Sequence, residues 1–565
     1  MDGIRRITVN GVDWRLREDA ADVLLASGAL DVWKLAEHPS AKLVKKGVHR
    51  IVFRVSLPRG DDEDDTLDLY VKVFLFPRAR DILRYMVRAS HGWREWRAGE
   101  ALERIGIATA PRVAVGVRRT GGVLRDDVLI TEAVENVVPL DRFVREELPK
   151  MPPDERGRFI RTAAPVLAAF VRRLHDGGIR HRDFHAGNVL LKTTPEGARQ
   201  LMLIDLHTVS RNAPLALGVR LRNLTRFNRF FSMLLGRTAR LRFWNAYVEG
   251  MPFLEAHRLE YARLLEAHTA RSCRAFWRKR ERRCLGTNRE FRRFRRNGVV
   301  GHTVRGRIEL PDNTLDRLPA GGMTMPDADV IKASTTTRIW EQRIDFGSQT
   351  RSVVVKRKDR RTGGPWRVLR TFLRHVGAMR EWRMAYALKL RGLPAVEMLA
   401  AFERRRLGVL YESVLVMSKV ENAENLVLFV NRTFTGELTR DTARLRRRMT
   451  RTLGRLVARL HRLGFTQRDL KPSNILVTVS DGPEADVAFT LIDFEGMRHR
   501  GKVSESRRVR DLARLASEFA DSPAVRDVDR MRFLEAYLLG RSVSAEQRRA
   551  WAAAIGHETA KRLKR

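Results

Sequence analysis

Two halves of this chain repeat each other in the same order and register. The segment REWRAGEALERIGI begins at residue 94, and REWRMAYALKLRGL begins at residue 380, which is 286 residues later. At that same offset LITEAVEN (129–136) recurs as LVMSKVEN, and LHDGGIRHRDFHAGNVLL (174–191) recurs as LHRLGFTQRDLKPSNILV. A unit of this length is a whole domain, since solenoid repeats have periods of about 20–50 residues. The 565 residues therefore predict two domains in tandem, 1–285 and 286–565.

Each repeat predicts a strand-rich first part and a helical second part. In the first copy, HRIVFRVSLP (49–58) and LDLYVKVFLF (67–76) are runs of β-branched and aromatic residues, typical of an antiparallel hairpin. Apolar residues recur at steps of three and four over 160–174 and again over 445–460, which predicts a buried helix face in both copies. The expected fold class is α+β, with a small β-rich N-lobe and a helical C-lobe in each domain.

Five polar side chains stand in a fixed order in the first copy. Lys72 lies in a strand-like run, and Glu95 lies in the REW segment of a predicted helix. The motif HRD ends at Asp183, Asn188 follows five residues later, and Asp205 ends the apolar run LMLID. This order matches the template of protein-kinase-type phosphoryl transfer. It predicts a protein-kinase-like domain.

The second copy repeats the same five positions. They are Lys356, Glu381, Asp469, Asn474 and Asp493. A single strand Lys or helix Glu is usually a surface residue. An ordered set that occurs twice in register favours the kinase-like fold in both domains.

The chemistry of phosphoryl transfer explains these residue types. Catalysis of this reaction depends on positioning and charge stabilisation, so the protein supplies cations and metal ligands. In each copy we expect the Lys, held by the Glu, to bind the α- and β-phosphates of ATP. The catalytic Asp183 or Asp469 orients the acceptor hydroxyl and takes its proton. The oxygen ligands for Mg²⁺ are expected to be Asn188, Asp205, Asn474 and Asp493.

Two departures from the kinase pattern leave the activity of each copy open. Only Gly47 stands where protein kinases carry a glycine-rich phosphate loop, and the second copy has no glycine there. His207 and Glu495 replace the glycine expected two residues after the metal-binding Asp. A fold does not guarantee an activity, so one half acting as a scaffold stays an alternative. Gly47 and His181 favour the first half as the catalyst.

The chain also carries a large positive charge. It has 109 Lys and Arg residues against 67 Asp and Glu, a formal net charge of +42. The densest stretch, 271–296, has twelve basic and two acidic residues interleaved with four aromatic ones. Such a field attracts anionic partners. We expect peripheral contact with an anionic membrane surface, with nucleic acid as the less favoured partner and a solvated helix face as the alternative to both.

The cysteine content and the first residues of the sequence predict the cellular compartment. The two cysteines, Cys273 and Cys284, support neither a disulfide framework nor a zinc site. The first residues, MDGIRRITVNGVDWRL, lack the apolar core of a signal peptide. These features predict a cytoplasmic protein.

At these motifs the chain resembles the lipopolysaccharide kinase family, bacterial enzymes that phosphorylate Kdo or heptose sugars of the lipid-linked core. The features that carry the resemblance are the REW helix, LITEAVEN with its Glu132, HRDFHAGNVLL and LIDLH. The resemblance implies ATP and Mg²⁺ as cofactors, a two-lobed α+β fold, and a sugar hydroxyl of a glycolipid as the acceptor. With such an acceptor, we expect the cytoplasmic protein to lie at the periphery of the inner membrane. The tandem arrangement departs from the single-domain pattern of the family.

Three functions stay open at the level of sequence. The first is a kinase that acts on a lipopolysaccharide core sugar or a related glycolipid. The second is a protein kinase or a small-molecule kinase, indicated by QRDLKPSN and HRDFHAGN respectively. The third is a pair of inactive kinase-like modules that bind an anionic partner through the 271–296 stretch.

Overall fold

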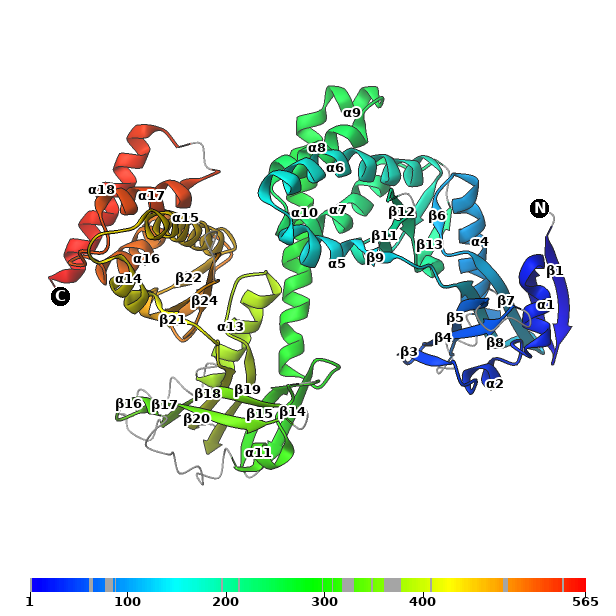
Figure 1. Cartoon of the computed structure of the whole chain (residues 1–565), viewed down its shortest axis with the longest axis horizontal. Helices are drawn as coiled ribbons and strands as arrows, with labels where there is room; N and C mark the ends of the chain where they lie inside the picture. Colours follow the sequence, from blue (N-terminus) through cyan, green and yellow to red (C-terminus); the bar gives the residue numbers. More distant parts are fainter. Residues whose placement is uncertain are drawn as a thin grey trace. The chain divides into compact units, whose positions relative to one another are not determined.

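The computed structural model describes residues 3–59, 65–76, 85–86, 88–194, 197–211, 214–296, 298–306, 308–317, 330–346, 349–359, 377–406, 409–480, 486–540 and 543–564. Contacts between these residues divide the chain into two units, Met1–Arg274 and Ala275–Arg565. Each unit consists of a strand-rich part followed by a helical part (Figure 1). The α+β class is therefore confirmed. The domain limits 1–285 and 286–565 stay predictions.

The N-lobe of the first unit is an antiparallel seven-stranded sheet in the order β1-β2-β7-β8-β5-β4-β3. The predicted hairpin is confirmed as its β4–β5 pair. Among the residues that the structure describes, the helices beside this sheet are α1 (Glu18–Ala26), α2 (Val32–Ala36) and α4 (His91–Arg104). The strands are β1 (Ile4–Val9), β2 (Val12–Arg17), β3 (Lys42–Lys46), β4 (Arg50–Pro58), β5 (Thr66–Phe74), β7 (Arg112–Thr120) and β8 (Val123–Glu132).

The C-lobe of the first unit is mainly helical. Its helices are α5 (Leu140–Arg142), η1 (Phe143–Glu147), η2 (Leu148–Lys150), α6 (Pro153–Asp176), η3 (Ala186–Asn188), η4 (Leu206–Thr208), α7 (Leu217–Leu234), α8 (Arg237–Val248), α9 (Pro252–Ala256) and α10 (Arg258–Glu281). Its short strands are β6 (Ala108–Thr109), β9 (Val137–Pro139), β10 (Ile179–His181), β11 (Val189–Thr193), β12 (Arg199–Leu203) and β13 (Val209–Arg211). They form a four-stranded sheet, β6-β12-β11-β9, and the pair β10-β13.

The N-lobe of the second unit repeats the strand order of the first, position by position. Its sheet runs β14-β15-β19-β20-β18-β17-β16, and its helices are α11 (Asp312–Arg317) and α13 (Ala378–Leu390). The strands are β14 (Phe291–Arg296), β15 (Val299–Val304), β16 (Val330–Ala333), β17 (Thr337–Asp345), β18 (Thr350–Asp359), β19 (Met398–Arg406) and β20 (Val409–Ser418).

The C-lobe of the second unit follows the same plan. Its helices are α14 (Leu426–Phe434), α15 (Arg440–Arg462), η7 (Pro472–Asn474), α16 (Glu505–Ser517), α17 (Asp527–Leu538) and α18 (Ala545–Leu563). The short helix η5 (Arg282–Leu285) lies at the entry to the second unit, before β14. Its short strands are β21 (Glu424–Asn425), β22 (Phe465–Gln467), β23 (Ile475–Val479), β24 (Val487–Leu491) and β25 (Met497–His499).

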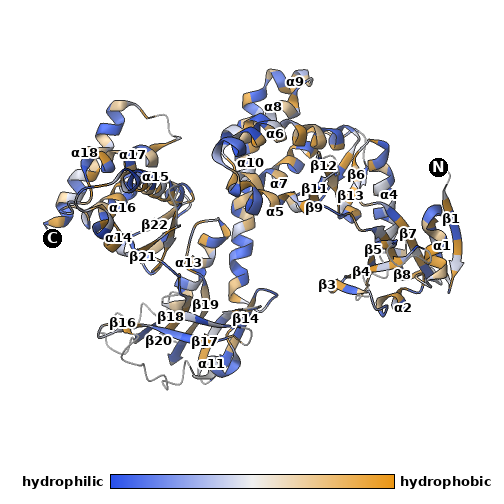
Figure 2. Cartoon of the chain, viewed as in Figure 1, coloured by the Kyte–Doolittle hydropathy of each residue, from blue (hydrophilic) through white to orange (hydrophobic). Residues whose placement is uncertain are grey.

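Apolar residues from different elements form the cores. One cluster fills the first C-lobe and includes Phe184, Phe227 and Trp244, while another lies in the first N-lobe around Trp14. In the second unit, Trp382 and Phe465 belong to one large cluster. Hydrophobic and hydrophilic residues alternate along the helices and strands (Figure 2). Among the described residues, every helix is too short or too polar to span a bilayer.

The basic stretch 271–296 is built into the fold. Its first part belongs to α10, and its last six residues are strand β14 of the second sheet. Three of its four aromatic side chains, Trp277, Phe291 and Phe294, are buried. These rings are core residues and offer no exposed platform on which nucleic-acid bases could stack.

Candidate active site

The lysine and glutamate predicted in the first copy meet across two elements. Lys72 on β5 forms an ion pair with Glu95 on α4. The start of α4 is fixed by Ser90, whose hydroxyl accepts a hydrogen bond from the Trp93 amide at 3.3 Å, and by Asp127 of β8, which accepts from Gly92 at 3.0 Å. The buried helix terminus therefore holds Glu95 against the sheet.

Asp205 stands at a strained turn between β12 and η4. Its φ of 63° lies in the left-handed region, which is uncommon for a residue other than glycine. One carboxylate oxygen, Oδ1, accepts hydrogen bonds from Arg50 Nη1 and from His207 Nδ1, both at 2.8 Å. Burial alone would raise the pKa of Asp205, but His207 and Arg50 outweigh it and hold that pKa far below its ordinary value.

The loop that carries Asp183 is tied together by Asn188. The side-chain nitrogen of Asn188 donates to the Asp183 carbonyl at 2.9 Å. His181 is buried, and its Nδ1 accepts a hydrogen bond from the Asp183 amide at 3.2 Å. Burial lowers the pKa of His181. The Asp183 side chain itself is 66% exposed, with His185 Nε2 3.7 Å from its carboxylate.

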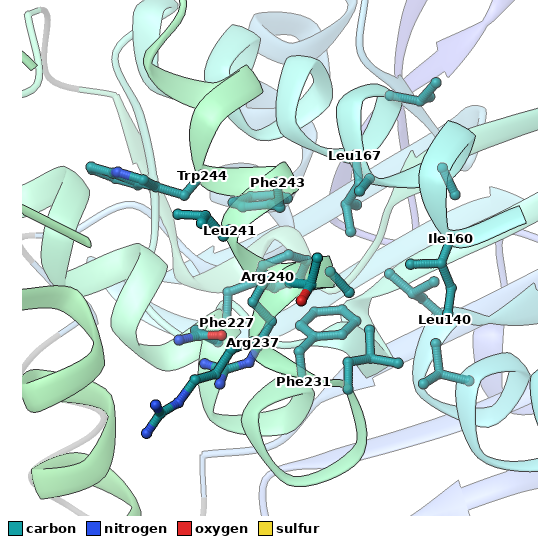
Figure 3. Close-up of a pocket in the computed structure, with 18 of the residues that line it drawn as sticks. Leu140, Ile160, Leu167, Phe227, Phe231, Arg237, Arg240, Leu241, Phe243 and Trp244 are labelled. Atoms are coloured by element: carbon teal, nitrogen blue, oxygen red, sulfur yellow. The ribbon is translucent and has the colours of Figure 1, made fainter. Parts of the chain in front are cut away.

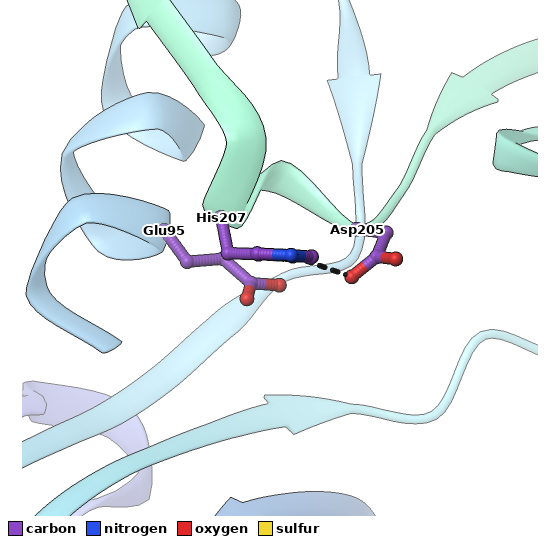
Figure 4. Close-up of side chains that lie close together, drawn as sticks. All are labelled: Glu95, Asp205 and His207. Carbon is purple, nitrogen blue, oxygen red and sulfur yellow. Dashed lines mark hydrogen bonds and ion pairs between the residues drawn. The ribbon is translucent and has the colours of Figure 1, made fainter. Parts of the chain in front are cut away.

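A group of ligand atoms suited to a cation lies beside this loop. Glu95 reaches from α4 toward Asp205 and His207, which lie at the turn after β12 (Figure 4). One ligand atom from each of the three residues lies within 4.8 Å of the others. Within the described part of the chain, Glu95 Oε2 is buried without a hydrogen-bond partner. Asn188 uses its nitrogen in the loop, so its Oδ1 is the amide atom available to a metal. The carboxylate oxygens of Asp205 and Oδ1 of Asn188 are hard donors, which fit Mg²⁺.

The second copy brings its lysine to two carboxylates. Lys356 Nζ on β18 lies 3.1 Å from Glu381 Oε2 on α13 and 2.8 Å from Asp493 Oδ1. Burial alone would lower the pKa of Lys356, but Glu381 and Asp493 outweigh it and raise that pKa. Asp493 repeats the left-handed backbone, with a φ of 55°. The next acidic residue, Glu495, pairs with Lys358 of the same strand.

The loop that carries Asp469 is closed in the same way as the loop that carries Asp183. Asn474 Nδ2 donates to the Asp469 carbonyl at 3.0 Å. In place of His181, Gln467 donates through Nε2 to the Asp493 carbonyl at 2.7 Å. A Cβ atom at Gly496 would lie 3.1 Å from Asp469 Oδ2, so the chain passes close to the carboxylate that is predicted to be catalytic.

All ten predicted site residues therefore occupy corresponding places in the two units. Sequence reasoning missed Arg50 and Lys358, because each reaches the site only through strand pairing. From the sequence, His207 and Glu495 were noted only because they stand where a glycine was expected. Their pairing, of His207 with Asp205 and of Glu495 with Lys358, was not predicted. The repeated pattern Asp-x-His and Asp-x-Glu after an apolar strand was the available signal.

A second feature that the sequence did not reveal is an apolar cavity in each C-lobe. The cavity of the first unit has a volume of about 730 Å³, and the corresponding cavity of the second unit about 540 Å³. In the first unit it lies among α5, α6, α7, α8 and α10, with Arg237 and Arg240 at one side (Figure 3). Its apolar lining includes Leu140, Ile160, Leu167, Phe227, Phe231 and Phe243.

Comparison with known proteins places both units in one family. The profile of the lipopolysaccharide kinase (Kdo/WaaP) family matches residues 46–247 and again 346–537. The chain is 30% identical over 175 residues to a lipopolysaccharide core heptose(I) kinase WaaP of Pseudomonas aeruginosa, a segment covering 30% of this chain and 63% of that protein. It is 29% identical over 116 residues to a 3-deoxy-D-manno-octulosonic acid kinase of Haemophilus influenzae, covering 20% of this chain and 43% of that one.

A solved structure, "WaaP in complex with acyl carrier protein", is 21% identical, with a TM-score of 0.33, and covers 46% of this chain and 99% of that one. The aligned segments span less than two thirds of the curated relatives' own length. The family profile, in contrast, matches most of this chain, in two regions that contain all ten site residues. The chain therefore belongs to the lipopolysaccharide kinase (Kdo/WaaP) family.

Proposed function

We propose that the chain is an ATP-dependent kinase that transfers the γ-phosphate to a hydroxyl of a lipopolysaccharide core sugar or a related glycolipid. The observation that carries the proposal is the duplicated site. In both units a strand Lys pairs with a helix Glu, an Asn closes the loop of the catalytic Asp, and a second Asp stands at a strained turn. Family membership supports ATP as the phosphate donor.

Each residue of the first site has a proposed task. Lys72, held by Glu95, binds the α- and β-phosphates. Asn188 and Asp205 hold Mg²⁺, which supplies charge stabilisation of the transferring phosphoryl group when bound. Asp183 is exposed enough to meet an acceptor, orients its hydroxyl and takes its proton. In the second site the same tasks fall to Lys356, Glu381, Asn474, Asp493 and Asp469.

We also propose that the enzyme meets its acceptor in the cytoplasm at an anionic membrane surface. The support comes from α15, where Arg447, Arg451 and Arg455 are exposed at steps of four residues and thus share one helix face. The corresponding positions of α6, 286 residues earlier, are Arg161, Pro165 and Ala169. Only the second unit therefore presents this basic face. Phosphates of a glycolipid or of other lipid head groups complement it.

The test of the proposed function is phosphate transfer from labelled ATP to lipid-linked core sugars by wild type, Asp183→Asn and Asp469→Asn. We expect the substitution in a working unit to reduce transfer by about a hundredfold or more, the usual contribution of a positioned general base. Because neither Asp is proposed to bind nucleotide, ATP binding should persist in both variants.

Other outcomes point to the alternatives. Phosphate transfer to a protein or to a small molecule, with none to core sugars, would contradict the proposed acceptor but support the proposed kinase activity. Failure of the wild-type chain to bind ATP with Mg²⁺ would contradict the kinase proposal and leave a scaffold that binds an anionic partner.

A further inference from the structure

Each site contains one more cation than the kinase template requires. In the first unit it is Arg50, the first residue of β4, whose Nη1 donates to Asp205 at 2.8 Å. In the second unit it is Lys358 on β18, which pairs with Glu495. Both side chains are mostly buried, with 20% and 13% of their surface exposed. Both are held by an anion of the Asp-x-His or Asp-x-Glu turn.

Strand pairing shows that these two cations occupy one structural position. Arg50 lies opposite Phe74 in the β4–β5 pair, and Thr337 lies opposite Lys358 in the β17–β18 pair. Phe74 and Lys358 each stand two residues after the site lysine, Lys72 or Lys356. Residues directly opposite in an antiparallel pair share a face of the sheet, as do residues two apart on one strand. Both units therefore have a cation at the same cross-strand pair. In the first unit it lies on β4, and in the second unit it lies on β18, which corresponds to β5.

The turn beside this position explains what the cation replaces. In the first unit the Gly47 amide donates to the Arg50 carbonyl at 2.9 Å, and in the second the Ser334 amide donates to the Thr337 carbonyl at 2.8 Å. Both hairpins are thus closed tightly where protein kinases have a longer glycine-rich loop. A tight turn offers few free amides to phosphate oxygens, whereas guanidinium and ammonium groups bind phosphate directly.

We propose that Arg50 and Lys358 bind the terminal phosphates of the nucleotide and take the place of the glycine-rich loop. This inference rests on the proposed function. Arg50 donates to Asp205 and Lys358 pairs with Glu495. When the nucleotide binds, each cation transfers its hydrogen bonds to the phosphate oxygens. Asp205 is then available to Mg²⁺, so the shift of Arg50 couples phosphate binding to metal binding.

The test in the first unit compares Arg50→Gln with Arg50→Lys in the full chain. Calorimetric titration with ATP, ADP and adenosine measures the affinity of each site. We expect Arg50→Gln to weaken ATP binding by about ten- to a hundredfold, the effect of losing a hydrogen bond to a charged group, and to leave adenosine binding unchanged. Arg50→Lys keeps the charge and should retain most of the ATP affinity.

The test in the second unit moves the cation between strands. Lys358→Met should weaken ATP binding at that site, and adding Thr337→Arg should restore it, because the second unit then carries its cation where the first unit does. Arg338→Gln is the matched control. Arg338 is exposed and follows Thr337 on β17, so its side chain points to the face of the sheet opposite to that of Thr337.

The outcomes separate this inference from the function on which it rests. A wild-type chain that binds no nucleotide contradicts both. A wild-type chain that binds ATP, together with an Arg50→Gln variant whose ATP affinity is unchanged or higher, contradicts this inference alone, because Arg50 then only restrains Asp205. Loss of ATP and adenosine binding to the same degree also contradicts it.

Discussion

His175 and its counterpart His461 have different side chains beside them. Each histidine is buried at the end of a long C-lobe helix and shares a hydrogen bond of 2.8 Å with a tyrosine, Tyr247 or Tyr537. His461 also lies 3.2 Å from the carboxylate of Asp511. In the first unit the position of Asp511 is taken by Asn223, which carries no charge. The first unit therefore buries His175 beside an uncharged amide, and the nearby charge of Asp176 does not offset the effect of burial on the pKa of His175.

Acid should destabilise the first unit through this residue. Burial lowers the pKa of His175 to about 4, against about 6.5 in an unfolded chain. The folded state thus binds the proton more weakly, so its stability is complete above pH 6.5 and declines as the pH falls toward 4. Over that window the free energy of unfolding should fall by about 3 kcal/mol.

Thiol labelling in urea can measure this in the full chain, because Cys273 is buried in the first unit and Cys284 in the second. We expect Cys273 to become reactive at a lower urea concentration at pH 4.5 than at pH 7. In the variant Asn223→Asp, which supplies a carboxylate as the second unit does, this difference should shrink. An equal difference in both chains would show that His175 is not its source.

At the scale of elements, α15 gives the clearest prediction. Replacing Arg447, Arg451 and Arg455 by Glu should abolish most binding to vesicles of phosphatidylcholine with phosphatidylglycerol, because each Arg near an anionic surface contributes about 1 kcal/mol. Removal of three such contributions is about a hundredfold in affinity. Co-sedimentation at low and high salt measures it, since exposed charges are screened by salt.

The control exchanges three exposed arginines of α10, Arg271, Arg274 and Arg278, for Glu. It makes the same charge change within the basic stretch of the sequence. Loss of vesicle binding in the α10 variant alone would show that the basic stretch 271–296, and not α15, contacts the membrane. Vesicle binding that survives in both variants would also contradict the role of α15.

Elements with a regular pattern were predictable from the sequence, and those with a mixed pattern were not. The β4–β5 hairpin shows β-branched and aromatic runs, and the site motifs are local strings, so both could be found. Strand β14 was missed because arginine occupies four of its six positions, all except Phe291 and Phe294, and hides the apolar face. Arg50, Lys358 and the C-lobe cavities depend on strand register and on helices distant in sequence, which no local pattern encodes.

At the scale of the whole molecule, the end of α10 and the turn η5 decide where the second unit begins. The buried Arg391 forms an ion pair with Glu281 at 2.6 Å, and its guanidinium lies 4.6 Å from the ring centre of Trp277. Trp382 Nε1 donates to the Cys284 carbonyl at 2.8 Å. These partners precede residue 286, the predicted start of the second domain.

A fragment that starts at residue 275 should therefore be more stable than one that starts at 286. The shorter fragment leaves the charge of Arg391 buried without Glu281, a loss that costs about 3–5 kcal/mol. Urea unfolding of the two fragments measures the difference. Arg391→Met in the shorter fragment removes the uncompensated charge and should regain part of the stability. Equal stability of both fragments would support the boundary at residue 285.

The identical strand order of the two sheets has a genetic consequence. The REW helices α4 and α13 follow the corresponding strands β5 and β18 in the chain, and their coding segments lie 286 codons apart. Recombination between these segments deletes one block in frame and joins β1 through β5 of the first sheet to α13 and everything after it. The product keeps one complete sheet, one site and α18 as its last helix. Loss of a copy by this route yields in one step a gene for a single unit with the full strand order. Its product lacks Glu281 and Cys284, the partners of Arg391 and Trp382, so it should be less stable than the parent second unit.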